Sequence, residues 1–363
     1  MCKLDIIEKG FDRLEEVSKK RSEWATLPLT EKLTILEEIR TIMMKEMDFE
    51  DFKASGKVGA RMKGFDVDNT VEGDFEATEE GFTYCMLVKG FLDDLIKAYK
   101  IRLGLEEAPK KFTKGNFETR KAINGQIVTK TFPIFPEDIK GISNHFHGEV
   151  WMDSSKIQDE SQVEAFAFEE AWDEAVGKEG GLMMVLGAGN QAFLSFVDIL
   201  QVTFTRNYVV YLKQHPIRNY ANAIYERLLA PLLSRGYLAI EAHSTNKRSS
   251  DLVYHPEVDA LHMTGGKATH DLLVWGVDSK EREQNLKART PKVQNVTSEL
   301  GAVTPWVVVP AKYTEAELTQ QAQIVARFGR YCFSFPAFRT YCRPMTSEKY
   351  SLFPFRLFLY HMN

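Results

Sequence analysis

The first hundred residues carry apolar side chains at steps of three and four positions. This spacing places the side chains on one face of a helix, so it predicts amphipathic helices near the N-terminus. The first of them has the apolar stripe Leu4, Ile7, Phe11, Leu14 and Val17. In the second, Thr30 can act as N-cap before the stripe Leu33, Leu36, Ile39 and Met43. A third helical stretch covers 76–104, with an apolar side formed by Phe91, Leu92, Leu95, Ile96 and Tyr99.

Residues 105–150 are instead rich in Pro, Gly, Asn and Lys. Asn124-Gly125 stands between extended residues, which is a signal for a hairpin turn. The basic residues of this stretch alternate with Glu and Asn, so we interpret them as a solvated loop and not as a binding patch. We therefore expect an arm or insert here and not a layer of the core.

Strand-like and helix-like patterns alternate from residue 180 onward. The apolar or extended stretches are 182–186, 208–212, 237–241 and 260–263, and the helical stretches are 192–204 and 220–233. Strands joined by crossover helices predict a parallel sheet in an α/β fold. The strands are apolar almost throughout, so we expect helices on both faces of that sheet.

Composition and charge narrow the classes of function. The chain has 363 residues, 44% of them hydrophobic and 27% charged, and a net charge of −5. This balance is typical of a globular protein with room for two domains, and its acidic charge argues against nucleic acid as a partner. The four cysteines form no CxxC pair, which favours a reducing compartment over a disulfide scaffold. With no pattern typical of a targeting segment or a membrane span, we expect a cytoplasmic protein without a membrane partner.

Glycine and polar residues follow three of the predicted strands. The turns are Gly187-Ala188-Gly189-Asn190, Lys213-Gln214-His215-Pro216 and Thr264-Gly265-Gly266-Lys267. In parallel α/β sheets, ligands bind at the carboxyl ends of the strands. The pattern therefore predicts a nucleotide or phosphate ligand, although neither GxGxxG nor a P-loop motif is present.

Four segments stand in an order and at spacings that resemble one enzyme family. They are Val185-Leu186-Gly187-Ala188-Gly189-Asn190, Asn207-Tyr208-Val209-Val210-Tyr211-Leu212-Lys213, Met263-Thr264-Gly265-Gly266 and Ser298-Glu299-Leu300-Gly301. Together they resemble the NAD(P)-dependent aldehyde dehydrogenase superfamily, in a less-studied branch, over most of the chain from about Trp24 to Arg339. The resemblance implies a Rossmann-like cofactor domain with N-terminal helices, followed by an α/β catalytic domain.

The resemblance also implies a role for the matched residues. Asn190 would donate to an oxyanion, Glu299 would be the general base, and Lys213 would hold the adenosine ribose of NAD or NADP. Further cofactor contacts would come from Gly187, Gly189, Thr264, Gly265, Gly266, Leu300 and Gly301. We expect Glu299 on a loop after the extended residues 293–296.

Two residues compete for the position of the nucleophile. Cys332 follows Gly329 by three positions, as in the family, whereas counting back from Arg339 leads to Ser334. We favour Cys332, because a thiol is intrinsically nucleophilic and a serine would need a base that the sequence does not supply. The competing interpretation is that Cys332 is a small buried hydrophobe in an aromatic run.

Taken alone, each candidate residue has an ordinary explanation. Asn190 alone is typical of a turn, Glu299 of a surface carboxylate and Lys213 of a solvated strand end, so their joint order carries the functional interpretation. Pro216 stands where NAD-preferring members often carry an acid, which leaves the choice between NAD and NADP open. The eight histidines show no metal-binding spacing, and we predict no metal.

The resemblance fades near Arg339, before an unusually aromatic tail. We expect an NAD(P)-binding domain with its helical region and arm over 1–297, and a partial catalytic domain over 298–363. The end is either divergent or the product of a truncated gene model. The implied activity is NAD(P)-dependent oxidation of a small-molecule aldehyde through a cysteine thiohemiacetal and thioester. Two alternative functions stay open: an acyl-thioester reductase, or an impaired member that binds a nucleotide or a partner without turnover. The chain could also form a homo-oligomer.

Overall fold

The amino-terminal third of the chain is helical, as its apolar stripes predict. The computed structural model describes residues 3–107, 118–132, 148–165, 180–241, 248–301 and 312–331. The helices that precede the first strand are α1 (Lys3–Ser18), α2 (Arg21–Thr26), α3 (Leu29–Lys45), α4 (Phe49–Met62), α5 (Val71–Thr83), the π-helical turn η1 (Tyr84–Val88) and α6 (Lys89–Arg102). The predicted stretch 76–104 is therefore interrupted by η1, where Tyr84 stacks on Phe52 of α4 with ring centroids 5.1 Å apart.

The predicted N-cap of the second stripe is wrong. Helix α3 begins at Leu29, and Pro28 occupies the N-cap with φ −55° and ψ 143°. A proline cannot donate a backbone hydrogen bond, so it fits the position before the first turn. Thr30 already belongs to that turn, and its carbonyl accepts a hydrogen bond from the hydroxyl of Thr34 at 3.0 Å.

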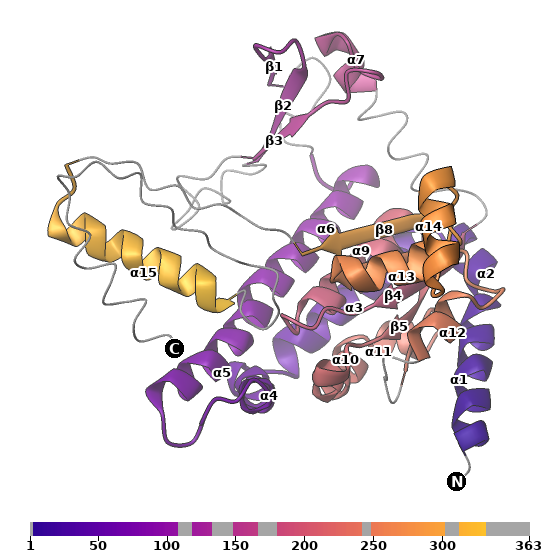
Figure 1. The fold of residues 1–363 in the computed structure, drawn as a ribbon, viewed down its shortest axis with the longest axis horizontal. Helices are drawn as coiled ribbons and strands as arrows, with labels where there is room; N and C mark the ends of the chain where they lie inside the picture. The colour runs from indigo at the N-terminus through magenta and orange to yellow at the C-terminus, as the bar shows by residue number, and fades with distance from the viewer. Residues whose placement is uncertain are drawn as a thin grey trace.

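The centre of the molecule is a five-stranded parallel sheet, which confirms the α/β expectation (Figure 1). Its strands are β4 (Gly181–Leu186), β5 (Tyr208–Lys213), β6 (Leu238–Ile240), β7 (Ala260–Gly265) and β8 (Val296–Leu300), in the order β6-β5-β4-β7-β8. The order reverses at β4, because β5 and β6 extend to one side of it and β7 and β8 to the other. Ligands of such sheets bind near the point of reversal, at the carboxyl ends of the strands.

Helices cover both faces of the sheet, as predicted. The connecting elements are α9 (Leu194–Arg206), the 3₁₀ helix η6 (Pro216–Ala221), α10 (Asn222–Leu228), α11 (Ala230–Leu233), α12 (Ser249–Val253), α13 (Lys267–Trp275) and α14 (Ser279–Ala288). The predicted helix 220–233 is thus three short pieces, the last of which has a proline in its first turn. None of the helices in the described ranges is long and apolar enough to cross a membrane.

The N-terminal helices and the sheet share one hydrophobic core. Trp24 of α2 is fully buried and donates its indole N–H to the carbonyl of Thr203 at 3.1 Å. Tyr99 of α6 donates its hydroxyl to the carbonyl of Phe204, also in α9, at 2.7 Å. Helices α2 and α6 are therefore held against α9 by directed bonds as well as by apolar packing.

The stretch predicted as an arm forms its own small sheet. Strands β1 (Thr119–Lys121), β2 (Ile127–Phe132) and β3 (Gly148–Trp151) pair antiparallel, and the helix α7 (Glu160–Ala165) follows them. The predicted hairpin turn is confirmed: Gly125 has φ +86°, and Ala122 and Gln126 are bonded across the turn. Figure 1 shows this sheet apart from the five-stranded one. The helix α15 (Glu315–Tyr331) lies in the last described range, and the predicted division at residue 297 stays a prediction.

Candidate functional site

The carboxyl edge of the large sheet collects most of the predicted site residues. Leu186 of β4 is in register with Lys213 of β5 on one side and with Met263 of β7 on the other. Thr264 is in register with Glu299, and Gly265 with Leu300. The turns after β4 and β7, the end of β5 and the end of β8 therefore meet at one edge.

Glu299 lies in a strand and not on the predicted loop. It is the fourth residue of β8, which pairs in parallel with β7 at the edge of the sheet. The strand begins at Val296, after a bend at residues 292–295, and it runs to Leu300 because β7 offers backbone partners up to Gly265. The Glu299 side chain is exposed.

The sheet separates the predicted residues into two groups by face. Registered neighbours point to the same face and successive residues to opposite faces. His262 points towards α9, because its Nε2 lies 3.3 Å from Oδ1 of Asp198 in that helix. Thr264 and its neighbour Glu299 share this face, whereas Lys213 shares the opposite face with Met263.

Lys213 is a buried cation at the end of β5. Its side chain is 4% exposed, and burial lowers the pKa of its ammonium to about 8, while the carboxylate of Glu241 acts to raise it. Glu241, the residue after β6, accepts the hydroxyl of Tyr211 and pairs with Nε of Arg248 at 3.1 Å. The cluster therefore holds two cations around one carboxylate, a charge balance suited to a ligand with hydroxyl or phosphate groups.

Asn190 lies in a turn whose main chain is hydrogen-bonded to buried side chains. Its own Oδ1 accepts the backbone N–H of Gln191 at 3.0 Å. Arg218 of η6 is 1% exposed and donates Nε to the carbonyl of Gly189 at 3.0 Å and Nη2 to the carbonyl of Asn190. The hydroxyl of Ser195 accepts the N–H of Ala188 at 3.2 Å. The main chain of the turn is thereby fixed at several successive residues.

Gly187 is explained by packing within the protein. A Cβ added there would lie 2.5 Å from Oε1 of Gln214 and 2.5 Å from Oγ of Ser195. A larger residue at this position would have to displace the side chains of Gln214 and Ser195, both of which are buried. Close packing thus accounts for this glycine, and its predicted contact with a cofactor stays a prediction.

The turn after β7 offers open backbone at the start of a helix. Gly266 is the N-cap of α13, and a Cβ added to it would meet nothing within 4 Å. Gly301 donates its N–H to the carbonyl of Gly265 at 3.1 Å, which ties the ends of β7 and β8 together. A helix N-terminus with an accessible backbone favours a phosphate group, so these residues fit the pyrophosphate of a dinucleotide.

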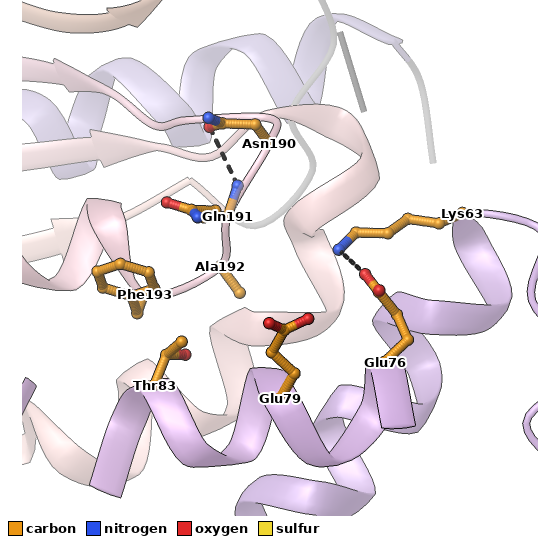
Figure 2. A pocket seen from close by; sticks show the side chains of 8 residues that line it. All are labelled: Lys63, Glu76, Glu79, Thr83, Asn190, Gln191, Ala192 and Phe193. Carbon is orange, nitrogen blue, oxygen red and sulfur yellow. Dashed lines mark hydrogen bonds and ion pairs between the residues drawn. The ribbon is translucent and has the colours of Figure 1, made fainter. Parts of the chain in front are cut away.

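A small pocket lies between the Asn190 turn and the α4–α5 hairpin. Figure 2 shows residues Asn190–Phe193 on one side, and Glu79 and Thr83 of α5 pointing towards them. Lys63, at the end of α4, forms an ion pair of 2.5 Å with Glu76 at its rim. The pocket has a volume of about 30 Å³, which is enough for a water molecule or a single small polar group.

Several features of the site have no signal in the sequence pattern. The burial of Arg218 beneath the Asn190 turn, the pairing of Glu241 with Arg248 and the approach of α5 all join segments far apart in the chain. Both candidates for the nucleophile, Cys332 and Ser334, lie outside the described residues. Cys85 lies within them, and burial raises the pKa of its thiol.

No family model and no curated protein sequence matches the chain. Solved structures do. The chain is similar to aldehyde dehydrogenase from Bartonella henselae, at 15% identity and a TM-score of 0.48, over 87% of this chain and 49% of that one. It is also similar to NADP-dependent glyceraldehyde-3-phosphate dehydrogenase from Bacillus halodurans in complex with NADP, at 13% identity and a TM-score of 0.47, over 88% and 49%.

A third similar structure is succinate-semialdehyde dehydrogenase from Burkholderia pseudomallei. The identity is 12% and the TM-score 0.47, over 88% of this chain and 49% of that one. The chain thus spans about half the length of these three proteins.

Proposed function

We propose that the chain is an NAD(P)-dependent oxidoreductase of the aldehyde dehydrogenase type, which oxidises an aldehyde through a cysteine thioester. The observation that carries the proposal is the register of the sheet. It brings Lys213, the open turn before α13, Glu299 and the Asn190 turn to one edge, from four separate stretches of sequence. This is the edge at which parallel α/β sheets bind nucleotides.

The face that carries Lys213 is suited to the adenosine half of the cofactor. Lys213 would hold the ribose, with Glu241 beside it, and the N-terminus of α13 would bind the pyrophosphate through its backbone N–H groups. Gly265 and Gly266 leave that backbone accessible. Bound NAD(P) would supply the acceptor for the hydride that the aldehyde loses.

The face that carries Glu299 is suited to the chemistry on the substrate. The thiolate of Cys332 would add to the carbonyl carbon, and the side-chain N–H of Asn190 would stabilise the negative oxygen. Loss of the hydride would leave a thioester on the cysteine. Glu299 would then take a proton from water as the water attacks this thioester, so that the acid leaves and the thiolate of Cys332 is restored.

Cofactor binding gives the first test. We expect Lys213→Met to weaken the binding of NAD or NADP by roughly 10-fold to 100-fold in calorimetry, the worth of one hydrogen bond to a charged group. Lys32→Met is the matched control: Lys32 is also buried and also has a pKa lowered to about 8 by burial. It lies at the other end of β5, where its Nζ donates to Oδ1 of Asn207 at 2.6 Å. Unchanged affinity in Lys213→Met would remove Lys213 from the site.

Turnover gives the second part of that test. The wild-type chain is mixed with a panel of aldehydes and either NAD or NADP, and formation of the reduced cofactor is followed by absorbance. A parallel reaction with acyl-CoA and NADPH detects the reverse direction. Cofactor binding without turnover in either direction would contradict the proposed activity and favour a nucleotide-binding role.

A further inference from the structure

Arg218 is the most deeply buried charged side chain near the candidate site. It lies in η6, directly after the strand that ends in Lys213, and is 1% exposed. Its Nε and Nη2 donate to the carbonyls of two consecutive residues, Gly189 and Asn190. Its Nη1 donates to the hydroxyl of Tyr220, whose ring lies 5.8 Å from the guanidinium carbon.

These contacts fix a short piece of main chain. Two carbonyls in succession, each bonded to one planar group, set the orientation of the two peptide planes that flank Asn190. A guanidinium can do this because its N–H groups form a rigid fork, whereas the ammonium of a lysine is a point charge on a flexible stem. The turn would otherwise leave these carbonyls to find other partners.

We propose that Arg218 is the positioning residue for Asn190, holding its turn so that the side-chain amide reaches the oxygen of the substrate. The inference rests on the proposed function, in which Asn190 is the oxyanion donor. A positioned donor stabilises the transition state only where its geometry is fixed beforehand. Arg218 would provide that geometry without touching the substrate or the cofactor.

The location of Arg218 also links the two halves of the site. His215 is the N-cap of η6, and its Nδ1 accepts the backbone N–H of Ile217 at 3.4 Å. The short segment from Lys213 to Arg218 thus starts at the proposed ribose contact and ends beneath the Asn190 turn. The end of β5 therefore places Lys213, and the segment that follows it places Arg218.

The test is a double-mutant cycle between Arg218→Met and Asn190→Ala. We expect Asn190→Ala to lower kcat by about 10²-fold to 10³-fold, the usual loss for one oxyanion donor. Arg218→Met alone is expected to lower kcat by about 10²-fold, as a misplaced group does. In the Asn190→Ala background, Arg218→Met should have little further effect, because the donor that it positions is already gone.

Two further measurements separate positioning from a general loss of structure. The Kd for the cofactor should stay within about twofold of the wild type, because the proposed ribose contact Lys213 is held by the pairing of β5 with β4 and not by Arg218. Arg235→Met is a control for the loss of such a bond elsewhere: this partly exposed arginine also donates to a backbone carbonyl, that of Pro231 at 2.9 Å, and pairs with Glu38. It should leave kcat unchanged.

The inference would be overturned if the two losses of kcat, expressed as free energies, add in the double mutant. It would also be overturned if Arg218→Met has a wild-type kcat. If Arg218→Met does not fold, Arg218→Lys is measured in its place, and failure of both variants to fold would make Arg218 a structural core residue and the inference wrong. A wild type without any turnover would be a failure of the proposed function. Hydrogen exchange then decides: unchanged protection of the Gly189–Gln191 amides in Arg218→Met means that Arg218 does not hold the turn.

Discussion

At the scale of single residues, two buried lysines lie near opposite ends of β5 and have different surroundings. Lys32 of α3 lies at the amino end, over the ring of Trp24 at 4.7 Å, with the neutral Asn207 as its partner. Lys213 lies at the carboxyl end beside the carboxylate of Glu241. Burial lowers the pKa of both to about 8, but only Lys213 is at the edge where a ligand can bind.

The binding of NAD or NADP should therefore weaken as the pH rises through 8. A pKa of about 8 means that Lys213 is mostly charged at pH 7 and mostly neutral at pH 9. If the charged form binds the cofactor, the Kd should increase by about tenfold between these values. Calorimetry at several pH values measures this change in the Kd for the cofactor. In Lys213→Arg the dependence should vanish, because a guanidinium stays charged; a flat profile in the wild type would contradict the prediction.

At the scale of elements, α4 and α5 pack through glycines. A Cβ added to Gly56 of α4 would lie 2.2 Å from the carbonyl oxygen of Ala77 in α5. One added to Gly81 of α5 would lie 3.0 Å from the backbone nitrogen of Lys53. The two backbones therefore lie in direct contact, which brings Glu79 and Thr83 to the Asn190 turn (Figure 2).

Gly56→Ala should destabilise the protein by about 1–3 kcal/mol, the usual cost of overpacking, because backbone must move to admit the methyl group. Urea unfolding measures the change. Gly90→Ala is the control: Gly90 lies near the start of α6, and its added Cβ would meet nothing within 4 Å. There the substitution should stabilise by about 0.5–1 kcal/mol, because alanine loses less entropy in a helix. Equal effects at both positions would rule out close packing as the cause.

At the scale of the whole molecule, helices α1, α2, α3 and α6 share one hydrophobic core with the large sheet. Buried residues of α1, α3 and α6 belong to the same hydrophobic core as those of β4 and β5. Trp24 and Tyr99 add hydrogen bonds from the helices to α9. The helical region is thus expected to unfold together with the sheet.

Leu36→Ala tests this coupling. Leu36 of α3 is fully buried, so its truncation should lower the free energy of unfolding by about 2–5 kcal/mol. Hydrogen exchange should show the same loss of protection in β4 and β5 as in α3. Met44→Ala, at a half-exposed position of the same helix, should change stability by no more than about 0.5 kcal/mol. Loss of protection confined to the helices would contradict a shared core.

The sequence itself predicts most of the elements and the edge where the candidate site lies. Strands β4, β5 and β7 are mostly apolar, and the glycine and polar residues at their carboxyl ends mark where they stop. Such signals are local: periodicity and turn residues depend on neighbours within a few positions. Thr30 and Glu299 were assigned wrongly for the same reason, because Pro28 and the partner strand β7 decide where their elements begin and end.

Tertiary structure alone decided the electrostatics and the support of the site. Nothing local shows that Lys213 and Arg218 are buried, that Glu241 pairs with Arg248, or that α5 faces Asn190. The pKa of a buried lysine depends on which segments exclude water from it, and those segments come from distant parts of the chain. The sequence by itself therefore determines the residue types of the site. Their charge states, the sheet faces to which they point and the distances between them are decided only when the sheet and its helices pack.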